Sequence, residues 1–163
     1  MAFQTQKKRL TPHAALLSLQ GFCAYQDRCH EEVRTRLKEL GVWGDDLEQI
    51  IADLIEEDFL NEERFAKSFA RGKFRMKSWG KTRIILELKK RKISEYCIKQ
   101  GLLEIEDDEY EQTICKLKAK YAAMHPELPP FELKVKTAHY IYSKGFEMEA
   151  ILETLKKQEM LNV

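Results

Sequence analysis

The residues of this sequence that could do chemistry are mainly basic side chains, concentrated in residues 58–93. From Arg64 to Lys92 there are twelve Lys and Arg residues and one acid, Glu87, so the local net charge is +11, whereas the whole protein is close to neutral at +1. Charge sorted in this way along a chain predicts a polyanionic partner such as nucleic acid. The alternative is a merely solvated surface, although intermixed signs would serve solubility better.

Twelve residues of this stretch are candidate contacts for such a partner, eleven of them basic and one aromatic. They are Arg64, Lys67, Arg71, Lys73, Arg75, Lys77, Trp79, Lys81, Arg83, Lys89, Lys90 and Arg91. Trp79 is included because tryptophans at interfaces often contribute much of the binding energy. A Trp that closes the core between two helices is the alternative interpretation.

The sequence lacks the motifs that usually signal catalysis: a Walker-type glycine loop, GxGxxG, HExxH, GxSxG and CxxC. Its four histidines are far apart. Cys23, Cys29 and His30 are close enough to suggest a metal site, but their spacing matches no zinc pattern and a fourth ligand is not evident. We therefore expect a binding protein and not an enzyme, with no catalytic residue, metal or cofactor.

Composition indicates a folded, helical protein: 44% of the residues are apolar and 34% charged, with only seven glycines and four prolines. No apolar run approaches the ~18 residues of a membrane span, and the basic residues 1–10 lead into no hydrophobic segment. A soluble cytoplasmic protein is expected. Its four scattered cysteines are then free thiols.

Helix signals follow one another along the chain. Thr11-Pro12 predicts an N-cap and first helical residue, and a helix over about 31–40 would stop at Gly41 in a left-handed conformation. Asp45 with Glu48 resembles a capping box that begins a third helix. In the basic stretch, apolar residues at spacings of four predict a helix over about 62–76, with Arg and Lys on another face. A second basic helix follows the break at 78–80.

An internal repeat organises these helices. Five apolar positions of the first unit recur as apolar residues 51 positions later, and four of the five recur 104 positions later. The sets are Val33, Leu37, Val42, Leu47 and Ile51; Ile84, Leu88, Ile93, Ile98 and Leu102; and Thr137, Ile141, Phe146, Ile151 and Leu155. The repeat predicts an all-α protein of three tandem three-helix units, 1–60, 61–108 and 109–163, about nine helices in an elongated, slightly curved body.

Acidic residues flank the basic unit. Residues 45–63 include nine acids before the first base, Arg64, and residues 104–111 include six more acids. These acids are either solvated helix faces, some of them favoured near helix N-termini, or a functional surface. Both interpretations stay open.

The residues around the basic stretch resemble the RecX family. The resemblance rests on Phe59-Leu60-Asn61-Glu62-Glu63-Arg64-Phe65-Ala66, Ser68-Phe69, Arg71, Gly80, Arg83-Ile84, Glu87-Leu88 and Ile93. Looser matches are Arg28 to Glu31 with Leu40-Gly41-Val42 in the first unit, and Tyr142 to Phe146 in the third. Asn61 replaces the usual aspartate but also caps helices well. Lys92 replaces the usual glycine, and its Cβ disfavours a left-handed turn there.

The resemblance implies a regulator of the bacterial RecA recombinase, active in recombination, DNA repair and the SOS response. RecX-like proteins bind RecA and its filament on DNA, hinder filament growth or promote disassembly, and also contact DNA. The twelve candidate residues would then meet single- or double-stranded DNA or the filament, with the protein acting as a monomer.

Two alternatives belong to other classes of protein. A helix-turn-helix DNA-binding protein is compatible with small three-helix units, but the basic residues spread over two helices instead of one recognition helix. A helical scaffold whose acidic segments dock a basic protein is the third possibility.

Overall fold

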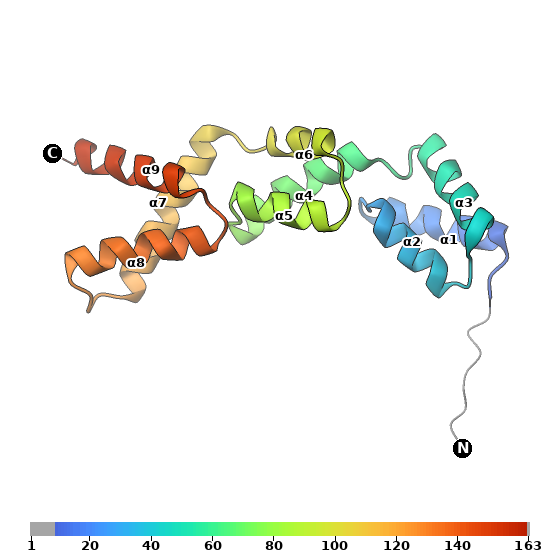
Figure 1. Ribbon diagram of the computed structural model, residues 1–163, viewed down its shortest axis with the longest axis horizontal. Coiled ribbons are helices and arrows are strands. Elements are labelled where there is room, and N and C mark those ends of the chain that lie inside the picture. The colour runs from blue at the N-terminus through green and yellow to red at the C-terminus, as the bar shows by residue number, and fades with distance from the viewer. Residues whose placement is uncertain (1–8, 163) are drawn as a thin grey trace, which may run out of the picture.

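The protein is an elongated, slightly curved arrangement of α-helices (Figure 1). The computed structural model describes residues 9–162, and within them the regular elements are nine helices. The helices are α1 (Pro12–Tyr25), α2 (His30–Glu39), α3 (Gly44–Glu56), α4 (Glu62–Lys77), α5 (Lys81–Lys90), α6 (Glu95–Leu102), α7 (Asp107–Met124), α8 (Pro130–Ser143) and α9 (Met148–Leu161).

The helices form three successive groups, and within each group every helix packs against the other two. We call them unit 1 (α1–α3), unit 2 (α4–α6) and unit 3 (α7–α9). The all-α fold class with three tandem three-helix repeats is confirmed. The residue limits of the three units stay a prediction. In the described part of the chain, no helix is both long and apolar enough to cross a membrane.

Two of the expected helix starts have a residue whose side chain caps the helix, and a third helix begins at a different residue from the one expected. The Thr11 side chain accepts a hydrogen bond from the Ala14 amide at 3.2 Å, and the Asn61 side chain accepts one from the Arg64 amide at 2.9 Å. The expected capping box at Asp45 is wrong, because the N-cap is Trp43 and α3 begins at Gly44, two residues earlier than a cap at Asp45 would place it. Asp45 lies in the first turn instead, where its charge favours the positive end of the helix dipole.

The same turn recurs between the second and third helix of each unit. Gly41, Lys92 and Gly145 occupy equivalent places in the repeat, and all three have positive φ, at 79°, 57° and 95°. The turn at Lys92, which its Cβ disfavours, therefore forms at a cost of about 1 kcal/mol. Hydrogen bonds hold it as they hold the first turn: the Ile93 amide donates to the Leu88 carbonyl at 3.2 Å, and the Val42 amide to the Leu37 carbonyl at 2.9 Å.

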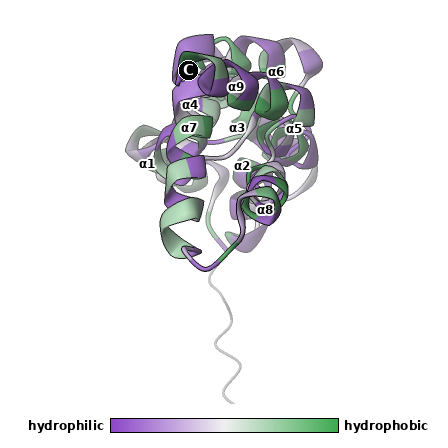
Figure 2. Cartoon of the chain, turned by 90° about the vertical axis from the view of Figure 1, so that its left-hand side faces the viewer, coloured by the Kyte–Doolittle hydropathy of each residue, from purple (hydrophilic) through white to green (hydrophobic). Residues whose placement is uncertain are grey.

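The repeated positions form the core. All fifteen are buried except Leu102, which is half-buried, and even the one polar member, Thr137, is only 3% exposed. Figure 2, a view along the long axis, shows hydrophilic and hydrophobic residues alternating along the helices, as amphipathic helices require.

The two junctions between units differ in chemistry. Units 2 and 3 share one hydrophobic cluster, whereas unit 1 has a cluster of its own and adds only Cys29 to the larger one among the described residues. Units 2 and 3 are also joined through the main chain: the Gly80 amide donates to the Lys144 carbonyl at 2.9 Å, and the Thr82 amide to the Gly145 carbonyl at 3.0 Å. This second junction is therefore apolar and rigid.

Tyr110 seals the junction between units 2 and 3. Its ring stacks on Phe146 with centroids 4.8 Å apart, and its hydroxyl donates to Glu147 while accepting from the Lys81 amide at 3.0 Å. Burial, and then the hydrogen bond to the Glu147 carboxylate, raise the pKa of Tyr110. The phenol is therefore a neutral donor in a fixed hydrogen-bond chain.

Replacing Gly80 tests how much this close contact between units 2 and 3 contributes to stability. A Cβ at Gly80 would lie 2.2 Å from the main chain of Gly145, so Gly80→Ala must push the two units apart. We expect a loss of at least about 2 kcal/mol in the free energy of unfolding, measured by urea titration with far-UV circular dichroism.

Gly72→Ala is the matched control, because a Cβ on that helical residue would have no described atom within 4 Å. It should leave stability unchanged or raise it by about 0.5–1 kcal/mol. Equal effects of the two substitutions would show that the junction tolerates a side chain.

Candidate nucleic-acid interface

Helix α4 presents half of the candidate residues, because its opposite side is buried. Phe65, Ala66, Ala70 and Phe74 face the core, and a Cβ at Gly101 of α6 would lie 2.7 Å from the Ala66 carbonyl oxygen. This close packing fixes the orientation of α4 and leaves its polar side chains on the outside.

Most candidate bases have a carboxylate partner. Lys67 pairs with Glu63 at 2.7 Å, and both Lys90 and Arg91 pair with Glu87, at 2.8 and 3.0 Å. These hydrogen bonds, that from Lys90 first, lower the pKa of Glu87. Such contacts within one helix are exposed and contribute little to stability.

Three further bases pair with acids of the stretch 104–111, one acid in the loop after α6 and two in the first turn of α7. Arg71 lies 2.8 Å from Glu104, Arg75 lies 3.3 Å from Glu109, and Lys81 lies 3.6 Å from Asp107. The acidic stretch 104–111 and the basic stretch are therefore in contact in the folded chain. The sequence shows only that the two stretches follow one another along the chain, although their opposite charges favour contact between them.

Arg64 connects units 1 and 2. Its Nε donates to Asp27 at 2.8 Å, one terminal nitrogen contacts the Asp58 carboxylate at 3.1 Å, and the other donates to the Asp58 carbonyl at 2.9 Å. Ser68 also donates to Asp27, at 2.6 Å. Sequence analysis missed Asp27 because a single acid in a loop carries no pattern.

A different arrangement surrounds Trp79. The guanidinium of Arg83 lies 4.1 Å from the centre of the Trp79 ring, and Lys73 Nζ lies 5.0 Å from it. Phe69 extends the cluster, with its ring edge-on to Trp79 at 6.3 Å and Arg91 at 4.9 Å from its centre. Trp79 is half-buried against the core. It therefore packs as a core residue and holds two cations at the surface.

Aromatic faces hold these cations without neutralising them. Within residues 9–162, no carboxylate lies within ion-pair distance of four candidate bases. They are Lys73, Lys77, Arg83 and Lys89. Lys73 and Lys77 are one turn apart on α4, and Arg83 meets Lys73 across the Trp79 ring. We call Lys73, Lys77, Trp79 and Arg83 the Trp79 cluster, and it is the part of the candidate set best suited to phosphate.

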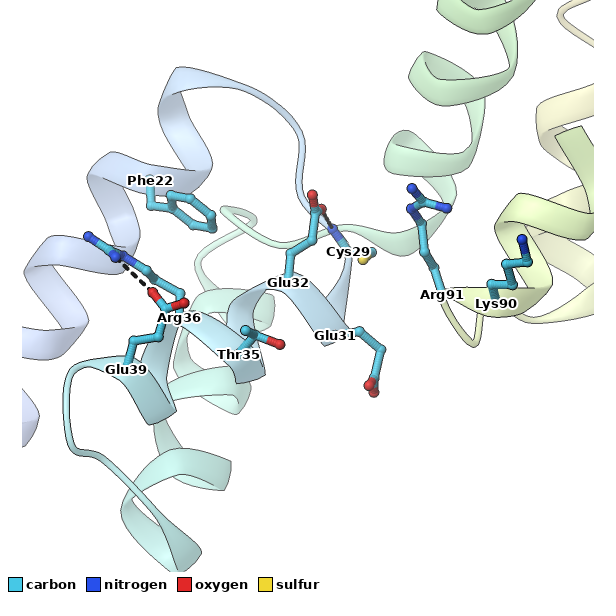
Figure 3. Close-up of a pocket in the computed structure, with 9 residues that line it drawn as sticks. All are labelled: Phe22, Cys29, Glu31, Glu32, Thr35, Arg36, Glu39, Lys90 and Arg91. Atoms are coloured by element: carbon cyan, nitrogen blue, oxygen red, sulfur yellow. Dashed lines mark hydrogen bonds and ion pairs between the residues drawn. The ribbon is translucent and has the colours of Figure 1, made fainter. Parts of the chain in front are cut away.

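The far end of α5 belongs to a different site. Lys90 and Arg91 line a groove of about 500 Å³ that also touches Glu31, Thr35 and Arg36 of α2 (Figure 3). Glu31 meets Lys92 across this side of the junction at 3.4 Å. The groove has charges of both signs, so it has no clear preference for an anion.

The thiols near this groove are unsuited to catalysis. Cys29 is fully buried, and burial raises its pKa, as it raises that of Cys23. A raised pKa keeps a thiol in its unreactive protonated form. In the described part of the chain, no group of three or more His, Cys, Asp or Glu side chains is arranged to hold a metal ion.

Comparison with known proteins shows that this surface is similar to part of one protein family. Residues 61–102, which include every candidate residue, match the model described as "RecX, second three-helix domain". The resemblance to the RecX family is confirmed. One relative, "Regulatory protein RecX" of Salmonella heidelberg, is 29% identical over 138 residues, covering 78% of this chain and 81% of the relative.

Other relatives agree with this assignment. "Regulatory protein RecX" of Lactobacillus johnsonii is 26% identical over 144 residues, which is 88% of this chain and 53% of the relative, so the chain spans about half the length of that protein. The crystal structure of RecX from Lactobacillus salivarius has the same fold, with a TM-score of 0.83 and 22% identity over 91% of this chain and 97% of that chain.

The Asp27 contacts predict a pH dependence of stability. Burial alone would raise the pKa of Asp27, but hydrogen bonds from Ser68 and Arg64 outweigh it, and the pKa lies below its ordinary value. The carboxylate therefore stabilises the fold fully above its unfolded pKa of about 3.9, and this contribution is lost as the pH falls through the lower folded pKa.

We expect Asp27→Asn to lower the free energy of unfolding by about 1 kcal/mol at neutral pH, because the contact is partly exposed to solvent. The gap between the variant and the original chain should shrink below about pH 4, as measured by urea unfolding over a pH series. Glu153→Gln, at an exposed acid of α9, serves as the control with a small, pH-independent effect. A constant gap for Asp27→Asn would show that its carboxyl titrates as it does in the unfolded chain.

Proposed function

We propose that this chain is a non-enzymatic regulator of the RecA recombinase that binds the RecA–DNA filament and hinders its growth or promotes its disassembly. The observation behind the proposal is the Trp79 cluster, whose cations have no carboxylate partner among the described residues and lie within the stretch that matches the RecX second three-helix domain. The names of the relatives support a regulatory role.

The chemistry of the cluster suits the phosphates of the filament. Lys73 and Arg83 are held in place by the Trp79 ring, so little side-chain freedom is lost when they contact phosphate. Arg83 can also offer two parallel donors to one phosphate group. Such contacts provide affinity without reading base sequence, as a regulator that acts along any DNA requires.

The elongated shape of the protein supports a mechanism in which it contacts two parts of the filament at once. Units 2 and 3 share one core and behave as one rigid piece, while unit 1 joins them through ion pairs. A rigid, elongated body that contacts DNA through unit 2 can reach a neighbouring RecA protomer through another unit. It would work as a monomer in the cytoplasm and would need no cofactor.

The test is the ATPase rate of RecA on single-stranded DNA, with this protein added well below one molecule per RecA protomer. We expect inhibition by the original chain. Replacing Lys73 and Arg83 together by Gln should raise the concentration for half-inhibition at least tenfold, because each lost contact to a charged group contributes about 1.5 kcal/mol.

The control replaces Lys116 and Lys156 of unit 3 by Gln, which removes the same charge from exposed residues outside the Trp79 cluster. It should inhibit like the original chain. Equal inhibition by both variants would remove the Trp79 cluster from the interface. Failure of the original chain to inhibit, together with sequence-specific binding to duplex DNA, would favour a helix-turn-helix DNA-binding protein instead.

A further inference from the structure

The acidic stretch 104–111 lies against the basic surface of unit 2. Glu104 reaches Arg71 at 2.8 Å, Glu109 reaches Arg75 at 3.3 Å, and Asp107 lies 3.6 Å from Lys81. One short segment, from the loop after α6 to the first turn of α7, thus pairs with three of the candidate bases. A phosphate that bound Arg71 or Arg75 would have to displace these carboxylates.

Carboxylate and phosphate are interchangeable partners for a guanidinium, since both offer two anionic oxygens to its planar fork. The existing pairs are open to solvent: 44% of the Arg71 side chain and 52% of the Arg75 side chain are exposed. Exposed pairs of this kind are weak. A polyanion can therefore displace them, but only by giving up part of its own binding energy.

Two other acids of the stretch 104–111 serve unit 3 itself. Glu111 pairs with Lys157 of α9 at 2.6 Å, and Asp108 lies in the first turn of α7, where its charge favours the helix dipole. Glu104 and Glu109 differ from these two because they face unit 2. Glu109 also lies in the first turn of α7, so its place both favours the helix dipole and allows the pair with Arg75, whereas Glu104 precedes α7 and its pair with Arg71 has no such explanation.

We propose that Glu104, Asp107 and Glu109 form an autoinhibitory contact, an internal competitor that occupies Arg71, Lys81 and Arg75 until phosphates displace it. This inference rests on the proposed function, because it assumes that the basic surface binds nucleic acid. The contact lowers affinity for isolated phosphate groups more than for a dense array of phosphates. It thereby reserves the surface for extended nucleic acid.

The experiment compares two double variants of equal charge. Replacing Glu104 and Glu109 by Gln removes the two acids paired with unit 2, and replacing Asp108 by Asn with Glu111 by Gln removes two acids of the same segment that face elsewhere. Binding of each to a fluorescent 30-mer of oligothymidylate is followed by anisotropy at several salt concentrations.

We expect the Glu104/Glu109 variant to bind about five- to tenfold more tightly than the original chain at low salt, with the gap narrowing as salt screens the internal pairs. The Asp108/Glu111 variant should gain less, through long-range charge alone. Equal gains in the two variants, or weaker binding by the first, would overturn the inference. Absence of binding by every protein would also overturn it.

A second comparison covers the case in which the double variant folds poorly, as judged by circular dichroism. Glu104→Gln alone should still tighten binding, and the gain should vanish when Arg71 is also replaced by Gln, because the freed cation is then missing. A gain that persists without Arg71 contradicts the competition. Binding of oligothymidylate by the original chain tests the proposed function, and the difference between the variants tests this inference. The inference can therefore fail while the proposed function stands.

Discussion

The arrangement of charges depends on the place where the main chains of Gly80 and Gly145 meet. A Cβ on either residue would collide with the facing residues of the other unit, at 2.2 Å for Gly80 and 2.3 Å for Gly145. Two main-chain hydrogen bonds across this contact then fix unit 3 on unit 2. Because α7 belongs to the unit so fixed, Glu109 in its first turn is held against α4 and pairs with Arg75. Glu104 follows α6, which packs on α4 within unit 2, and it pairs with Arg71.

A single run of positive charge in the sequence thus serves three purposes in the fold. Arg64 connects unit 1 to unit 2, Arg71 and Arg75 meet acids of the stretch 104–111, and Lys73 and Arg83 rest on the Trp79 ring. The first purpose is structural, since the guanidinium donors are already engaged. Lys73 and Arg83 keep their charge available, because a ring quadrupole attracts a cation without cancelling it.

The two junctions also give the body two kinds of mechanical behaviour. Apolar burial and main-chain contacts join units 2 and 3, and such contacts are insensitive to salt. Unit 1 is joined to unit 2 through Asp27 with Arg64 and Ser68, and through Glu31 with Lys92. Polar interfaces between domains permit relative motion. Unit 1 can therefore move relative to units 2 and 3, which stay fixed to each other.

The sequence by itself determined the helices, the repeat and the family resemblance, because these depend on short-range chemistry. Thr11 and Asn61 cap helices through their own side chains, and apolar residues at offsets of 51 and 104 are buried in each unit. Lys92 adopts a left-handed turn that its side chain disfavours, because the packing of unit 2 outweighs a local preference. Only the tertiary structure decided which bases pair with acids far away in the sequence. Arg71 and Glu104 are 33 residues apart, and their meeting depends on how helices pack and not on any spacing along the chain.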